Sequence, residues 1–78
     1  MIVIDSSGKH TYSVDKVELY IVRTALMAKN IFTGETSVLA VFDSSAKALA
    51  AIDEIIYFLH NDGSVYNLSY SNGVIHDT

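Results

Sequence analysis

The side chains best suited to acid–base or metal chemistry in this chain are three histidines, His10, His60 and His76. No two of them stand at the short spacing that metal-binding motifs use, and the sequence has no Cys to complete a site. A Gly-rich loop that could cradle a phosphate is missing as well. The sequence therefore predicts neither a metal site nor a bound cofactor.

Two of the histidines have a carboxylate close by. His60 precedes Asp62, and His76 precedes Asp77, so each pair could supply a base with an orienting carboxylate. The structural interpretation is that His60 sits at a helix end, where the dipole favours it, and that His76 lies in a solvated tail. No Gly-x-Ser-x-Gly elbow marks a nucleophilic serine. We favour the structural interpretation and predict no catalytic residues, so that the chain is not an enzyme.

Any site would have to be positioned by the segment 43–63, which carries a helical start, period and stop. Ser44 or Ser45 can serve as the N-cap. Asn61 or Gly63 can take the left-handed conformation that ends a helix. Apolar residues recur at helical spacing on one stripe, formed by Ala48, Leu49, Ile52, Ile55, Ile56 and Leu59. We predict an amphipathic helix with this stripe toward the core.

The rest of the chain reads as β-structure. Residues 2–4 and 10–14 predict a hairpin around Gly8. Residues 37–42 predict a strand that is apolar on both faces and therefore central in its sheet. After the helix, residues 64–68 predict a last strand.

Residues 17–31 leave three interpretations open. Their β-branched and aromatic residues favour two strands with a tight change of direction near Arg23 and Thr24. One long bent strand and a helix from Asp15 are the alternatives. The proposed turn contains no Gly, Asn or Pro, the residues that usually mark one.

The predicted order is β-β-β-β-β-α-β, an α+β fold in which one helix covers one face of an antiparallel meander. The helix stripe is expected to pack on the sheet face that carries Leu19, Ile21 and Val41. The chain is predicted to be a single domain, residues 1–78. Residues 69–78 either form a loose tail or return as a short strand at Val74 and Ile75.

Composition limits the partners. Half of the 78 residues are hydrophobic, and a domain this small buries its apolar surface incompletely, so a second copy is the expected partner. The net charge of −4 disfavours nucleic acid. No apolar run reaches the length of a membrane helix, and the start does not read as a signal peptide. A cytoplasmic location without membrane partners is expected.

Four residues are candidates for an interaction surface. Tyr57 and Phe58 fall beside or opposite the helix stripe, and Tyr20 and Val22 fall on the sheet face that the helix leaves free. The favoured function is a non-catalytic interaction or structural module, homodimeric or bound to another protein. The alternative is a small-molecule or nucleic-acid binding protein that uses a sheet cleft lined by Tyr and His.

Part of the chain carries a resemblance. A strand meander is followed by Leu39-Ala40-Val41-Phe42-Asp43-Ser44-Ser45 and an Ala-rich helix that contains Ala51-Ile52-Asp53-Glu54-Ile55. This pattern, over residues 17–60, resembles small uncharacterised proteins of Gram-positive bacteria and their phages. The resemblance implies an accessory protein of phage or mobile-element origin. It implies no catalytic residues, and the Gly or Asn turn that such proteins place between the middle strands is absent.

Overall fold

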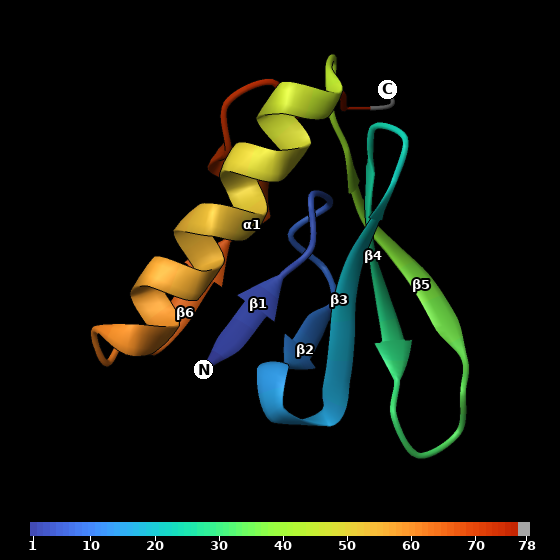
Figure 1. Ribbon diagram of the computed structural model, residues 1–78, viewed down its shortest axis with the longest axis vertical. Coiled ribbons are helices and arrows are strands. Elements are labelled where there is room, and N and C mark those ends of the chain that lie inside the picture. Colours follow the sequence, from blue (N-terminus) through green and yellow to red (C-terminus); the bar gives the residue numbers. More distant parts are fainter. Residues whose placement is uncertain (77–78) are drawn as a thin grey trace.

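The computed structural model describes residues 1–76 and has an α+β fold (Figure 1). Within this range the order β-β-β-β-β-α-β is confirmed. The elements are β1 (Ile2–Ile4), β2 (Thr11–Ser13), β3 (Val17–Val22), β4 (Ala25–Asn30), β5 (Thr36–Val41), α1 (Ser45–His60) and β6 (Val65–Asn67). Single 3₁₀ turns, η1 (Val14–Lys16) and η2 (Leu68–Tyr70), follow β2 and β6.

The strands form two three-stranded sheets instead of the single predicted meander. One has the order β2-β1-β6, in which β1 is antiparallel to β2 and parallel to β6. The other is the antiparallel sheet β3-β4-β5. The turn η1 separates the two sheets along the chain, and the long connection through α1 allows β6 to return parallel to β1. Such a distant pairing leaves no signal in local alternation.

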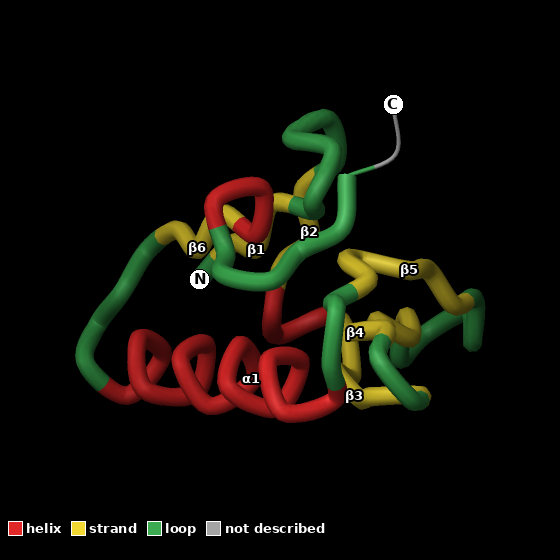
Figure 2. The backbone as a smooth tube through the Cα atoms, turned by 90° about the horizontal axis from the view of Figure 1, so that it is seen from above, coloured by secondary structure: helices red, strands yellow, loops and turns green. Residues whose placement is uncertain are grey.

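The three layers enclose one core. Figure 2 shows α1 along one side of the β2-β1-β6 sheet, with the β3-β4-β5 sheet beside both. Every layer contributes buried apolar residues, which are Val3, Leu26, Ala28, Leu39, Ala40, Phe42, Ala48, Ala51, Ile55, Tyr66 and Leu68. The helix therefore packs into the angle between two sheets, and its outward side is left to solvent.

The β3–β4 hairpin confirms two strands for residues 17–31. Val22 pairs with Ala25, so the change of direction takes only Arg23 and Thr24. Arg23 has a φ of 58°, in the left-handed region that residues other than Gly and Asn rarely adopt. The position of the turn was predicted, but its conformation had no sequence signal.

The strand β5 lies at the edge of its sheet, so its predicted central place is wrong. Its apolar residues on both faces have another cause, a β-bulge. Leu26 of β4 pairs with Ala40, but Met27 pairs with Val38, which leaves Leu39 as an extra residue. The bulge shifts the alternation, so the neighbours Leu39 and Ala40 are both buried.

The same bulge turns Val41 outward. Its side chain is 37% exposed, and the expectation that it packs under the helix is therefore wrong. Leu19 and Ile21, the other two residues of that expected face, do pack against the buried cluster. Alternation alone places a residue on the wrong face wherever a strand contains a bulge.

The ends of α1 follow local chemistry. Ser44 is the N-cap, and its hydroxyl accepts a hydrogen bond from the Lys47 amide at 3.3 Å. Asp62, with a φ of 59°, takes the left-handed conformation expected at Asn61 or Gly63. A Cβ on Gly63 would lie 2.8 Å from the Phe58 carbonyl oxygen, so this position requires glycine for space.

The predicted helix stripe is only half buried. Of its members, Ala48 and Ile55 are buried, whereas Leu49, Ile56 and Leu59 are about half exposed. The third buried residue of α1 is Ala51, which lies beside the predicted stripe. The apolar arc of α1 is wider than the two small sheets can cover. The inward direction is therefore rotated away from the centre of the stripe.

The segment after β6 returns to the β3-β4-β5 sheet. Phe42 and Val74 form an antiparallel bridge, in which the Asp43 amide donates to the Gly73 carbonyl and the Ile75 amide to the Val41 carbonyl. Of the two open interpretations, the strand-like return therefore describes residues 74 and 75. The part of that expectation that concerns residues 77–78 lies outside the described residues.

Candidate functional site

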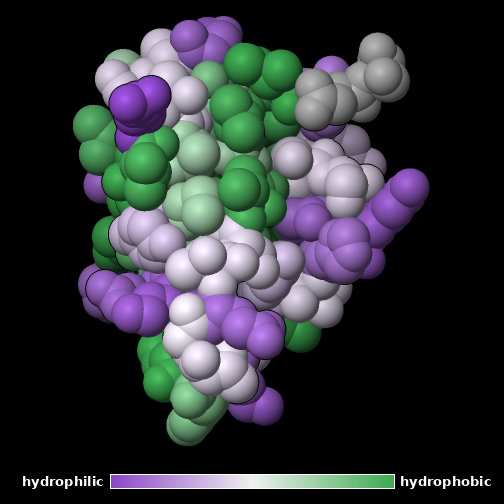
Figure 3. Space-filling view, turned by 90° about the vertical axis from the view of Figure 1, so that its right-hand side faces the viewer, coloured by the Kyte–Doolittle hydropathy of each residue, from purple (hydrophilic) through white to green (hydrophobic). Residues whose placement is uncertain are grey.

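The outward side of the β3-β4-β5 sheet carries an apolar surface that we call the outer face. It is built by cross-strand neighbours, because side chains that pair across strands share one side of a sheet. One row contains Tyr20, Met27 and Val38, and the next contains Val22, Ala25 and Val41. Figure 3 shows apolar residues gathered over the upper part of this side of the molecule, with polar residues below them.

The outer face is accessible. Val22 and Val38 are each about half exposed, at 50% and 53%. Tyr20, Ala25 and Met27 are half-buried by their neighbours. Within residues 1–76, no helix or strand covers the outward side of this sheet. A third row, of exposed Glu18, Lys29 and Thr36, ends the apolar area with one negative and one positive side chain.

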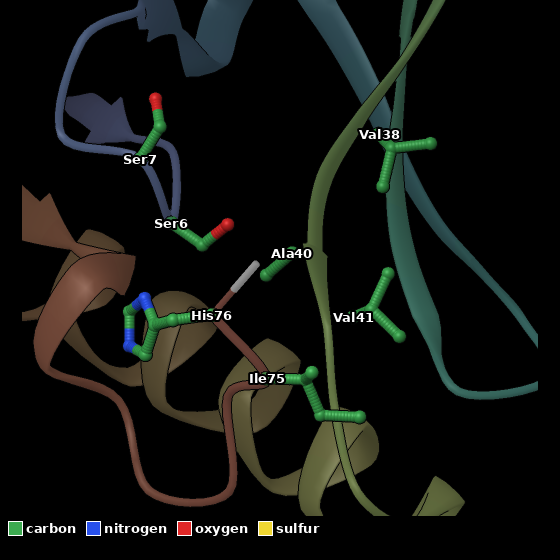
Figure 4. A pocket seen from close by; sticks show the side chains of 7 residues that line it. All are labelled: Ser6, Ser7, Val38, Ala40, Val41, Ile75 and His76. Carbon is green, nitrogen blue, oxygen red and sulfur yellow. The ribbon is translucent and has the colours of Figure 1, made fainter. Parts of the chain in front are cut away.

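A cleft of about 400 Å³ continues the outer face across the edge of β5. Figure 4 shows Val38 and Val41 on one side of the strand, and Ser6, Ser7 and His76 on the other. The His76 ring points away from the valines. The polar groups therefore do not converge on one point in the cleft, as they do in sites that orient a small ligand.

The most connected polar cluster surrounds Asp5, which is only 6% exposed. One carboxylate oxygen accepts from the Ser7 hydroxyl at 2.6 Å and from the Ser7 amide at 3.2 Å. The other lies 2.9 Å from His10 Nδ1. Burial raises the pKa of Asp5, but the hydrogen bonds from Ser7 and His10 together outweigh it and hold this pKa below its usual range.

This cluster fixes a turn and does not form a relay. In a hydrolytic triad the imidazole stands between the serine and the carboxylate. Here the carboxylate stands between the side chains of Ser7 and His10, which bond different oxygens of it. The Asp5 amide also donates to the His10 carbonyl, which closes the β1–β2 hairpin. The signal for this cluster was Asp5 followed by Ser-Ser-Gly, a sequence typical of a turn closed by an Asp side chain.

Asp5→Asn should lower the free energy of unfolding by about 1–3 kcal/mol at pH 7, because charged hydrogen bonds become neutral ones. Since the pKa of Asp5 is lowered in the fold, the carboxylate stabilises the protein above the unfolded pKa of 3.8 and loses this effect as the pH falls through the folded value. Urea titrations at pH 7, 5 and 3 should show the difference between wild type and variant shrinking toward pH 3.

The control for this measurement is Asp53→Asn, which changes an exposed carboxylate on α1. It should shift the free energy of unfolding by less than about 0.5 kcal/mol. A difference between wild type and Asp5→Asn that stays constant from pH 7 to pH 3 would contradict the role assigned to the Asp5 charge.

A second polar cluster lies between β6 and α1. Burial raises the pKa of Tyr66, and the negative charge of Glu54 adds to this, against the hydrogen bond that its hydroxyl forms with Ser71 at 3.2 Å. The phenol therefore stays protonated at neutral pH and cannot act as a base. Two small clefts open here, both lined by Tyr66 and one of them also by Tyr70, and neither contains a histidine.

The structure separates the residues predicted for an interaction surface. Tyr20 and Val22 lie on the outer face. Tyr57, 63% exposed, lies near the end of α1, which Figure 1 places away from the β3-β4-β5 sheet. Phe58 is partly used within the fold, since its ring packs on Tyr66 with centroids 5.6 Å apart. The four residues therefore belong to two surfaces.

The remaining members of the outer face were missed by sequence reasoning. They are Ala25, Met27, Val38 and Val41. The predicted turn at Arg23 and Thr24 already implies the pairs of Tyr20 with Met27 and of Val22 with Ala25. Val38 and Val41 could not be assigned to this face from the sequence, because the bulge changes the alternation of β5.

The predicted histidine–carboxylate pairs find no support within residues 1–76. His60 and Asp62 are both exposed at the end of α1, and no hydrogen bond joins their side chains. The pairing of His76 with Asp77 lies outside the described residues. In the described part of the chain, no group of three or more His, Asp or Glu side chains could hold a metal ion.

Comparisons with known proteins give no match for this chain, whether with family models, with curated proteins or with solved structures. Among residues 1–76, no helix is long and apolar enough to cross a membrane.

Proposed function

We propose that this protein is a non-catalytic interaction module that works as a homodimer, with the outer face as its contact surface. The observation that carries the proposal is the contiguous apolar area formed by the Tyr20 row and the Val22 row on the outward side of the sheet. Exposed apolar areas of this kind mark contact sites on small proteins. A two-fold dimer covers the same surface on both copies at once.

The polar clusters support a non-catalytic role. Asp5 is engaged on both oxygens within its turn, and Tyr66 is held protonated. The alternative function, ligand binding in a cleft lined by Tyr and His, would need both residue types at one site. The clefts described above contain either His76 or a tyrosine. An accessory role in a phage or mobile element stays a prediction from the sequence resemblance.

The small size of the face places the dimer among weak, transient contacts. Three strands about 4.8 Å apart and about 20 Å long offer far less than the roughly 800 Å² per partner of a standard interface. We therefore expect a weak dimer in exchange with monomer. Sedimentation equilibrium from low to high micromolar concentration should show the mass rising from 8.5 kDa toward twice this value.

Val38→Glu should abolish the association, because it places an uncompensated charge within the apolar contact. The matched control is Val65→Glu. Val65 has nearly the same exposure, 56% against 53%, and also lies on an edge strand, but in the other sheet. A mass of 8.5 kDa for the wild type at every concentration would refute the homodimer. Loss of association in Val65→Glu alone would move the contact to the β2-β1-β6 sheet.

A further inference from the structure

We infer that the two copies meet face to face about a two-fold axis that crosses the strands, so that Glu18 of each copy pairs with Arg23 of its partner. This inference rests on the proposed homodimer and adds its geometry. It comes from two charged residues at the two ends of β3, Glu18 in the polar row beside the outer face and Arg23 in the turn that follows Val22. Glu18 lies at the start of the strand and Arg23 just after its end, and both are exposed.

The first step is the spacing along β3. Glu18 and Arg23 are five residues apart in the sequence, which corresponds to about 16 Å of extended chain. Tyr20 and Val22 lie between them on the outer face. A negative end, an apolar centre and a positive end therefore follow one another along this strand.

The second step is the choice of axis. Packed sheets keep their strands roughly aligned, so a two-fold axis between two facing sheets runs either along the strands or across them. An axis along β4 would place each row opposite itself, with Lys29 of one copy facing Lys29 of the other. Like charges brought together in this way are repulsive and select against an arrangement.

An axis across the strands reverses the direction of β3 in the second copy. The row of Tyr20, Met27 and Val38 then meets the row of Val22, Ala25 and Val41 of the other copy. The Glu18 end meets the Arg23 end, and symmetry repeats this pair. Facing sheets lie about 10 Å apart, a gap that the long Glu and Arg side chains can bridge at the rim. Only this arrangement matches both the apolar rows and the charges.

The test is a charge exchange measured by sedimentation equilibrium on the full chain. Glu18→Arg and Arg23→Glu should each raise the dimer Kd by about tenfold or more, because two attractive rim pairs become repulsive. The double variant, and an equimolar mixture of the two single variants, should both return to the wild-type Kd within about threefold. The mixture is also a control for the fold. It contains the same two single-variant chains that associate weakly on their own, so a recovered Kd cannot come from a change in the fold of either chain.

The outcomes distinguish the geometry from the dimer itself. A wild type that stays monomeric overturns both proposals. If the wild type associates, Val38→Glu abolishes the association, and Glu18→Arg and Arg23→Glu leave the Kd unchanged, the dimer is supported and this geometry is refuted. A mixture of Lys29→Glu with wild type that associates more tightly than either protein alone would also refute it, because that result requires the axis along the strands.

Discussion

Ile55→Ala is expected to cost about 2–5 kcal/mol of the free energy of unfolding. Ile55 is 2% exposed and lies on the inward side of α1 with Ala48 and Ala51. Its truncation removes apolar contacts and leaves a cavity between two alanines, whose short side chains cannot move in to fill it. For a domain of 78 residues the total stability is about 4–12 kcal/mol, so this variant will be near the limit of folding.

Ile56→Ala is the matched comparison, one residue further along the same helix. Ile56 is 48% exposed, so the substitution should cost less than about 1 kcal/mol. Urea titrations of both variants, followed by far-UV circular dichroism at low protein concentration, measure the difference. Equal losses at the two positions would mean that the helix is rotated from the orientation described above.

This comparison also shows how far the sequence predicts the fold. Cap, period and stop place the helix within a residue or two, because each depends on neighbours in the chain. The sequence also favoured the hairpins around Gly8 and at Arg23. The sequence predicted that the whole apolar stripe faces the core, with Ile55 and Ile56 both turned toward it. The inward direction is set instead by the angle between two sheets, and the periodicity of α1 contains no information about that angle.

The candidate site was predicted only in part, because local alternation identifies some of its residues and pairing between strands places the others. Tyr20 and Val22 were assigned to an uncovered sheet face because β3 alternates regularly. Val38 and Val41 were not, because the bulge at Leu39 changes the phase of β5. A bulge is fixed by pairing with the neighbouring strand, so alternation within β5 cannot reveal it. The cluster of Asp5 and His10 had a local signal, the turn sequence after Asp5. Its polar groups bond one another and stabilise the β1–β2 hairpin.

Phe42 ties the end of β5 to the C-terminal segment, which makes this residue the other position of large effect. Its side chain is 1% exposed, and its amide donates to the Thr24 carbonyl at 2.8 Å. It also bridges to Val74, which ties the segment after β6 to the end of β5. The side chain thus fills the core at the point where the sheet, the start of α1 and the C-terminal segment meet.

Phe42→Ala is therefore expected to cost about 3–5 kcal/mol, which approaches the whole stability of a domain of this size. Phe32→Ala is the control. The same atoms are removed there from a turn where the ring is 77% exposed, and the free energy of unfolding should change by less than about 0.5 kcal/mol. The two hydrogen bonds of the Val74 bridge are formed by the residues on either side of Phe42, so hydrogen exchange at the amides of Asp43 and Ile75 should accelerate in Phe42→Ala and stay unchanged in Phe32→Ala. Unchanged exchange at these two amides in a destabilised Phe42→Ala variant would show that the C-terminal segment is held by its own contacts and not through the core.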